Sequence, residues 1–379
     1  MNFNEIRDEN LVYFGERIEP YFASSIIIRG MLDHNNLNNI LELKTGVRWL
    51  YTNNYFFMFK ADLLKIKADI TKNFTRKSKG YANSLIKRCI EQGNDLITIS
   101  KKVQKESERN IDKDKMYELL NAYITAASNY MIFQNIALFE ESIAEITKDL
   151  VSRDSKNNEE AIKLNNLITT PSMLTAAEKE RDDFLKICSA VNSEKLLEEH
   201  TKRYGWLALR FFVGEPWTKE YVISKIKDKV IAKEELTNRL EHRENVEKMI
   251  SLATKNFSQK DKETVKLIRD MVYLRTQRTD YFQESSYYIQ PLLKKIAKEL
   301  EVTYSELLYL SAQEILLALK NKLNYSEIIQ KRKIAFLVVF DHDKDIILES
   351  DVAIKYVSER PILNRDVINV KEVSGKVAY

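Results

Sequence analysis

The chain has 379 residues, of which 44% are hydrophobic and 31% are charged, so its composition allows two or three folded domains with real hydrophobic cores. Its two cysteines, Cys89 and Cys188, have no partners at metal-ligand spacing. This argues against a disulfide framework and a zinc site, and it favours a reducing, cytoplasmic location. Only eight glycines and five prolines interrupt the chain, and this scarcity predicts long helices.

The N-terminal part begins with a predicted β-hairpin. The segment 47–59, VRWLYTNNYFFMF, is rich in β-branched and aromatic residues on both sides of two asparagines, which tolerate a tight turn. The apolar spacing then changes to that of amphipathic helices over 61–70 and 81–109. We therefore expect a hairpin followed by two helices.

The segment 116–146 carries apolar residues at helical spacing and is predicted to be the longest helix of the chain. Within it, residues 119–139 have no charged side chain, and their number matches the length of a transmembrane helix. Uncharged polar residues from Asn121 to Asn135 nevertheless gather on one stripe of the helix. We therefore expect a buried amphipathic helix and no association with a membrane.

The polar stretch 151–160 breaks this pattern and predicts a linker to a second helical unit. Helix starts in that unit are marked by capping sequences, in which a side chain that caps a helix stands three residues before a glutamate. The capping residues are Thr175, Thr303, Ser311 and Asn324.

The C-terminal part returns to β-rich sequence. Residues 334–340 and 346–350 are apolar runs on either side of the turn sequence DHDKD, and they predict a second hairpin. The closing residues 373–379, VSGKVAY, alternate small or polar with apolar residues, which predicts the first strand of a further domain.

The fold class that follows is mainly α: a long-helix bundle with small β-hairpins near residues 47–59 and 334–350, ending in the first strand of a truncated domain. The expected division along the chain is an N-terminal hairpin and long-helix unit over 1–150, a second helical unit over 160–332, a hairpin and connector over 333–370, and the truncated domain over 371–379.

Positive charge is concentrated in the segment 60–115, which carries 15 lysines and arginines against 8 aspartates and glutamates. A basic helical face can contact RNA, yet aromatic residues that would stack on bases are not interleaved through this one. We favour a solvated face, so nucleic acid is not an expected partner. Docking of a protein or an RNA on these N-terminal helices stays open as an alternative.

Two segments hold the candidate ligand contacts. The segment 198–218 contains His200, Trp206 and Arg210, and the imidazole of His200 either hydrogen-bonds a ligand or a neighbouring carboxylate, or packs beneath aromatic residues. In the segment 272–293, Arg275 and Arg278 lie at i and i+3 on one helical face. Such an arginine pair suits phosphate or carboxylate recognition, and it equally suits buried ion pairs to glutamates.

No catalytic, cofactor-binding or metal-binding residue is assigned from the sequence. Asp341, His342, Asp343 and Asp345 either bind a hard metal ion or form an Asp-rich turn between strands, and the turn is the favoured interpretation. The four histidines complete no nucleophile triad, and the glycines form no phosphate-binding loop.

Three stretches resemble a known family. They are LLEEHTKRYGWLALRFFVGEPWTKEYVISKIKD over 196–228, RTDYFQESSYYIQPLLKKIAKELEVTYSELLYLSAQEILLAL over 278–319, and INVKEVSGKVAY over 368–379. In this order they resemble the helical region that precedes the swivelling phosphohistidine domain of phosphoenolpyruvate-utilising enzymes, and phosphoenolpyruvate-synthase-like proteins above all. The resemblance covers roughly residues 163–379, with a fainter likeness over the N-terminal hairpin and helices.

The resemblance implies phosphotransferase chemistry for the relatives. In that family an ATP-grasp domain passes a phosphoryl group to a histidine on the swivelling domain, which carries it to pyruvate or another acceptor, and ATP and Mg are the cofactors. The family's histidine follows a Gly-Gly stretch after the GKVA strand. This sequence ends before any counterpart, and none of its four histidines matches.

Two functions are therefore expected. The first is the helical linker or regulatory portion of a phosphoenolpyruvate-synthase-like phosphotransferase, inactive alone, with no cofactor in this chain and with an ATP-grasp domain or partner protein supplying the ATP chemistry. The alternative is a non-catalytic helical scaffold or adaptor that binds protein or RNA through its basic N-terminal helices.

Overall fold

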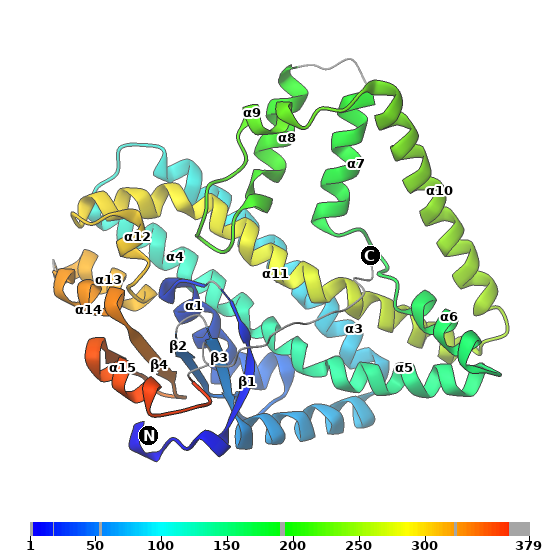
Figure 1. Ribbon diagram of the computed structural model, residues 1–379, viewed down its shortest axis with the longest axis horizontal. Coiled ribbons are helices and arrows are strands. Elements are labelled where there is room, and N and C mark those ends of the chain that lie inside the picture. The colour runs from blue at the N-terminus through cyan, green and yellow to red at the C-terminus, as the bar shows by residue number, and fades with distance from the viewer. Residues whose placement is uncertain (1–2, 18, 53–54, 190–193, 322–323, 364–379) are drawn as a thin grey trace.

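The computed structural model describes residues 3–17, 19–52, 55–189, 194–321 and 324–363, and shows a mainly helical fold with one small β-sheet (Figure 1). Of the described residues, 73% are helical and 8% lie in strands, which confirms the predicted fold class. The strand predicted within 371–379 lies outside the described residues.

The strands form one antiparallel sheet in the order β1-β3-β2-β4-β5. They are β1 (Leu11–Glu16), β2 (Trp49–Thr52), β3 (Tyr55–Phe59), β4 (Phe336–Phe340) and β5 (Asp345–Glu349). Both predicted hairpins are confirmed as the pairs β2–β3 and β4–β5. The hairpins are joined along β2 and β4, where Leu50 lies opposite Val339, and β1 extends the sheet beside β3. Residues from the two ends of the chain therefore share one sheet.

One continuous helix, α3 (Lys60–Ser107), stands where two helices were predicted over 61–70 and 81–109. The predicted break was wrong because Ile70 and Tyr81, three helical turns apart, lie on the same buried face, so the apolar stripe continues across the polar residues between them. Helix α3 packs along α11 (Gln259–Glu299). At their contact a Cβ on Gly93 would overlap the ring of Tyr281, so glycine allows the two helices to approach closely.

The single helix predicted over 116–146 is also wrong. The chain forms α4 (Lys113–Met131), a 3-10 helix η4 (Ile132–Phe139) and α5 (Glu140–Asp154). In η4 the buried Asn135 amide donates hydrogen bonds to the carbonyls of Met31 at 3.0 Å and Ile132 at 3.2 Å, so a side chain competes for a carbonyl of the helical ladder. The predicted burial of this segment is confirmed, and no helix among the described residues is long and apolar enough to cross a membrane.

Helix α1 (Tyr21–Leu32) crosses α4 at a second close contact that depends on glycine. A Cβ on Gly30 would overlap the backbone carbonyl of Ser128 and the Cβ of Met131. Backbone cannot give way as a flexible side chain can, so this crossing requires glycine.

The middle of the chain forms an arm that projects from α11 (Figure 1). The arm is made of α7 (Ala176–Ser189), α8 (Glu194–Tyr204), α9 (Lys219–Ser224) and α10 (Lys229–Ala253). It has a small hydrophobic core of its own, which includes Phe184, Leu185 and Val222. Before the arm, α6 (Asn158–Ile168) packs on α5, and the short turn between these two helices lies within the predicted linker.

The shorter helices complete the fold. They are η1 (Phe3–Glu5), η2 (Asp8–Asn10), α2 (His34–Asn36), η3 (Leu37–Leu41), η5 (Gly205–Ala208), α12 (Tyr304–Leu307), α13 (Ala312–Asn321), α14 (Ser326–Ile334) and α15 (Ser350–Ser358). Three predicted caps are confirmed, because Thr175, Thr303 and Ser311 each accept from the backbone of the glutamate three residues on. The fourth is wrong, since Asn324 accepts from the backbone of Ser326 instead.

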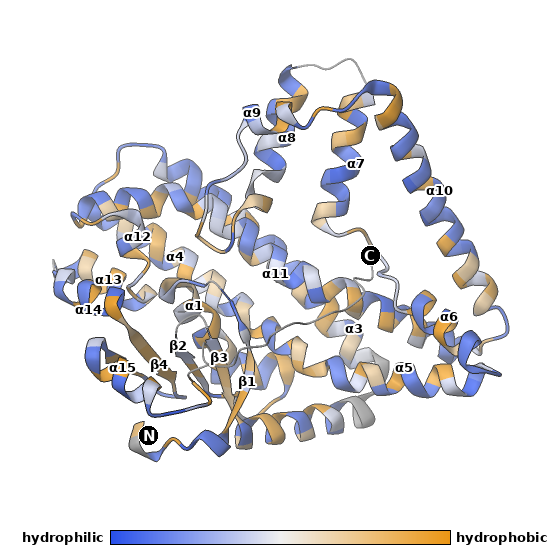
Figure 2. Cartoon of the chain, in the orientation of Figure 1, coloured by the Kyte–Doolittle hydropathy of each residue, from blue (hydrophilic) through white to orange (hydrophobic). Residues whose placement is uncertain are grey.

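One large hydrophobic core draws residues from each of the predicted segments 1–150, 160–332 and 333–370, among them Phe22, Phe282 and Phe340. Figure 2 shows strands that are largely hydrophobic beside helices with one hydrophobic side, whereas α10 is hydrophilic along most of its length. The division of the chain into separate domains stays a prediction.

Candidate functional site

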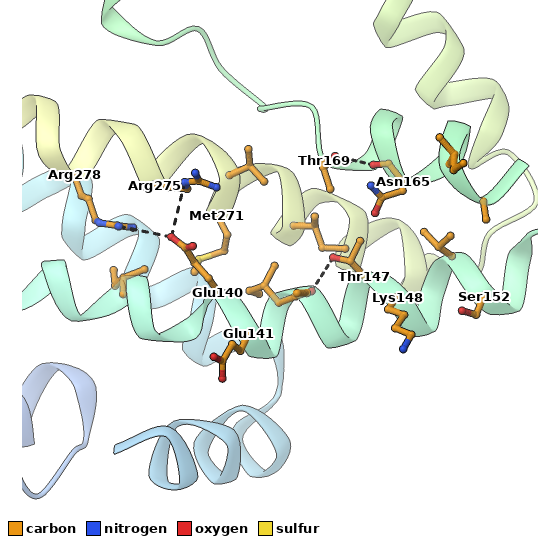
Figure 3. A pocket seen from close by; sticks show the side chains of 18 residues that line it. Glu140, Glu141, Thr147, Lys148, Ser152, Asn165, Thr169, Met271, Arg275 and Arg278 are labelled. Atoms are coloured by element: carbon orange, nitrogen blue, oxygen red, sulfur yellow. Dashed lines mark hydrogen bonds and ion pairs between the residues drawn. The ribbon is translucent and has the colours of Figure 1, made fainter. Parts of the chain in front are cut away.

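An open groove of about 750 Å³ lies between α5, α6 and α11 (Figure 3). Helix α5 contributes residues at steps of four, including Ile143, Thr147 and Val151, so they form one face of the helix. Helix α11 contributes Met271 and Arg275 from the facing side. The packing of α11 against α5 and α6 therefore brings two segments together that lie more than a hundred residues apart in the sequence.

The floor of the groove is apolar. It is formed mainly by Ile136, Ile143, Val151, Ala161, Ile268 and Met271. The hydroxyl of Thr147 donates to the carbonyl of Ile143 at 2.7 Å, so its hydrogen is not available to a ligand. The groove thus offers apolar surface along its length.

The side chains of Arg275, Arg278 and Glu140 face one another at one end of the groove (Figure 3), and two further charged residues of α5, Glu141 and Lys148, also line it. The Glu140 carboxylate lies 3.9 Å from Arg275 Nε and 3.7 Å from an Arg278 guanidinium nitrogen. Both distances are longer than a hydrogen bond, and the Glu140 side chain is 49% exposed. Glu140 is therefore a loose partner that an anionic ligand can displace.

The two arginines differ in exposure, since the side chain of Arg275 is 69% exposed and that of Arg278 only 9%. Within the described part of the chain, the closest acceptor of the Arg278 guanidinium is Gln134 Oε1, at 3.4 Å. Burial lowers the pKa of Arg278, while the nearby Glu140 acts in the opposite direction. A guanidinium has five N–H donors, so this buried cation retains capacity to bind an anion.

The backbone of Arg278 is held firmly. Its carbonyl accepts hydrogen bonds from the Tyr130 hydroxyl at 2.9 Å and from the Gln134 amide at 3.2 Å. These bonds tie α11 to α4 and η4 beside the groove, so they fix the position from which the guanidinium extends.

The other predicted contacts lie elsewhere. His200 is buried in the arm between Phe184 and Tyr204, and its Nε2 lies 2.9 Å from Glu180. It thus faces a carboxylate and aromatic rings, as both interpretations of the sequence allowed. Trp206 is buried in η5, and Arg210 is exposed with its guanidinium 5.4 Å from the centre of the Phe211 ring. Neither residue lines the groove. The roles of the five predicted residues stay predictions.

The DHDKD segment forms the turn between β4 and β5. Its Asp345 is bound by the guanidinium of Arg29, and its His342 ring lies 5.6 Å from that of His34. Among the described residues there is no cluster of three or more histidine, cysteine, aspartate or glutamate side chains that could hold a metal ion.

Several groove residues were not predicted from the sequence, and Glu140 is the most important of them. It begins α5 directly after the uncharged stretch 119–139, and this position is the one signal that could have drawn attention to it. Its proximity to Arg278 depends on tertiary packing, which no local pattern encodes.

No protein-family model matches the chain, and no curated protein matches it.

Proposed function

We propose that the chain is a helical binding protein that takes an elongated, largely apolar ligand with a carboxylate or phosphate at one end. The ligand occupies the groove between α5, α6 and α11. The observation that carries the proposal is the buried, weakly paired guanidinium of Arg278 at the end of an apolar groove.

The size of the groove supports a small-molecule ligand. Binding sites for such ligands usually have volumes of about 300–1,000 Å³ and are lined mainly by apolar side chains with a few polar groups that fix orientation. The groove, at about 750 Å³, has these properties.

The arginine pair supports an anionic end group. A charge-assisted hydrogen bond to a guanidinium is stronger than one between neutral groups, and it gains further in a partly buried site. Arg278 supplies the buried cation and Arg275 an exposed one beside it, so a carboxylate or phosphate can be held from two sides.

The test compares dodecanoate with dodecanol by isothermal titration calorimetry on the full chain. The two probes share an apolar tail and differ in charge. We expect dodecanoate to bind at least tenfold more tightly, and we expect Arg278→Gln to remove most of this preference, because one charged hydrogen bond contributes about 1.5–3 kcal/mol.

The matched control is Arg203→Gln. Arg203 is an exposed arginine of the arm that pairs with Asp183 and does not line the groove, so this variant should bind both probes as the parent does. Equal affinities of the parent for the two probes, or no binding of either, would refute the proposal.

A second candidate function is the helical linker or regulatory portion of a phosphoenolpyruvate-synthase-like phosphotransferase in the cytoplasm. It is supported by the three stretches that resemble that family. The packing of the first two stretches against each other adds support. The carbonyl of Phe212, in the first stretch, accepts hydrogen bonds from the Gln290 amide at 3.1 Å and from the Tyr304 hydroxyl at 2.6 Å, and both of these residues lie in the second stretch.

This candidate is tested on the protein purified from its natural host. Incubation with labelled ATP and Mg, without pyruvate, should place acid-labile phosphate on a chain that contains these residues, or on a protein that co-purifies with it, and later addition of pyruvate should remove the label. The absence of such label on either would contradict this function and would leave the groove proposal standing.

A further inference from the structure

A second, smaller cavity lies on the other side of Arg278, where the sheet, α1, η4 and α11 meet. Its volume is about 60 Å³, and its walls are mostly apolar and aromatic, with Phe14, Phe56 and Phe282 among them. A single water molecule needs about 10–15 Å³ of cavity volume, so this cavity has room for roughly four to six water-sized groups.

Two polar side chains in the wall of this cavity have buried atoms without a hydrogen-bond partner among the described residues. They are Glu19 Oε1 and Trp49 Nε1, and each residue is only 4% exposed. Leaving such an atom unpaired costs about 1–3 kcal/mol, so both atoms call for a partner within the cavity. One is an acceptor and the other is a donor.

Packing positions the Trp49 side chain, and a backbone hydrogen bond anchors the Glu19 main chain. The Trp49 indole packs edge-on against Phe14, with ring centres 5.0 Å apart, and lies against Phe56 as well. The Glu19 backbone carbonyl accepts from the Tyr51 hydroxyl at 2.6 Å. The Trp49 indole is therefore held in place, and the main chain that carries the Glu19 carboxylate is fixed beside it.

Two cations line the same cavity. Arg17 lies 3.6 Å from Glu19 Oε1, and the buried Arg278 forms part of the opposite wall. Burial is the main cause that lowers the pKa of Arg278, Glu140 acts in the opposite direction, and the positive charge of Arg17 adds a small lowering contribution. A small anion between Arg17 and Arg278 would be attracted to both guanidinium groups.

The wall of the cavity also contains strained backbone. Phe211 and Phe212 have φ angles of 38° and 37°, a left-handed conformation that bulky residues rarely adopt. Phe211 lines the cavity. Backbone strain of this kind persists where the surroundings enforce it, and it clusters at ligand sites.

We propose that this cavity binds a two- or three-carbon hydroxy or amino acid. Its carboxylate accepts hydrogen bonds from Arg278 and from the Trp49 indole N–H, and its hydroxyl or amino group donates to Glu19. Such a ligand has five or six heavy atoms, which fits the volume, and it supplies hydrogen-bond partners for the two buried atoms of this cavity that lack one, Glu19 Oε1 and Trp49 Nε1. The proposal does not depend on a ligand in the larger groove, since Glu19 and Trp49 do not line that groove.

The test is calorimetric titration of the full chain with glycolate, glycine and inorganic phosphate. We expect saturable binding of glycolate or glycine, weakened at least tenfold by Trp49→Phe and by Glu19→Gln, because each substitution removes one charged hydrogen bond. Glu19→Gln should weaken glycine more than glycolate, since an ammonium group needs the carboxylate and a hydroxyl can donate to an amide.

The matched control is Trp206→Phe, which changes another buried tryptophan that does not line the cavity and should leave binding unchanged. Far-ultraviolet circular dichroism of each variant verifies that it is folded. Absence of saturable binding of both organic acids would overturn the proposal, as would binding of inorganic phosphate alone, or equal affinities of the parent, Trp49→Phe and Glu19→Gln.

Discussion

Replacement of Arg332 by methionine would leave two glutamates without their ion-pair partner where α13, α14 and β5 meet. The Arg332 side chain is 2% exposed, and its guanidinium makes two 2.7 Å hydrogen bonds to Glu314 and one to Glu349. A further 3.0 Å bond reaches the carbonyl of Tyr309. Methionine fills a similar volume and supplies none of these donors.

The expected loss in the free energy of unfolding is about 3–5 kcal/mol, the cost of removing one partner from a buried ion pair. The pKa of Glu314 shows the effect of this ion pair on the carboxylate. Burial raises the pKa of Glu314, yet the bonds to Arg332 outweigh burial and leave the pKa lowered. A carboxylate whose pKa is lower in the folded than in the unfolded state stabilises the fold at pH values above its unfolded pKa. This stabilisation is lost as the pH falls through the folded pKa, so the effect of Arg332→Met should shrink in acid.

Urea unfolding followed by circular dichroism at pH 7 measures the loss. The control is Lys331→Met, because Lys331 is the adjacent cation and its pair with Glu327 is exposed, so this variant should lose less than about 1 kcal/mol. The double variant Arg332→Met, Glu314→Gln should recover part of the stability, since it removes one of the stranded charges. A loss below about 1 kcal/mol for Arg332→Met alone would refute the reasoning.

Three further predictions concern single positions. Burial raises the pKa of Asp280 to about 6, so its ionised form opposes folding above that pH, and Asp280→Asn should raise the free energy of unfolding by about 3 kcal/mol at pH 8 and by almost nothing at pH 4, measured by urea titration. Gly30→Ala should lower it by about 2–3 kcal/mol through overlap with the Ser128 carbonyl, whereas Gly15→Ala, where a Cβ meets nothing within 4 Å, should cost far less in the same assay. Glu140→Gln should tighten dodecanoate binding about threefold, because it removes the carboxylate that competes for Arg278, and weaker binding in calorimetry would contradict the arrangement of the groove.

The hairpins were predictable because their signals are local. Dense β-branched and aromatic residues on both sides of a turn define β2–β3 and β4–β5. The pairing of β2 with β4 was not predictable, because it joins residues nearly 290 positions apart, and no local pattern encodes such a contact. β1 was missed as well, since its residues Leu11–Glu16 include Gly15 and only a short alternation.

The helices show the same limit. Apolar spacing identified the helical segments, yet it placed a break in α3 where none exists and missed the 3-10 turns of η4, because both outcomes depend on what packs against the segment. For the groove, the spacing of Arg275 and Arg278 placed them on one face of a helix, and the structure puts both in its wall. Their partner Glu140 comes from a distant segment, so only the fold reveals it.

The pairing of β2 with β4 has a consequence for synthesis on the ribosome. Strand β2 emerges early, and its second neighbour is translated almost 290 residues later, which takes roughly 15–60 seconds at about 5–20 residues per second. During that interval one hydrogen-bonding edge of β2, with its wholly buried Leu50, lacks its native partner. An exposed apolar edge of this kind attracts other chains, so nascent molecules that stop before β4 should be the ones that chaperones hold.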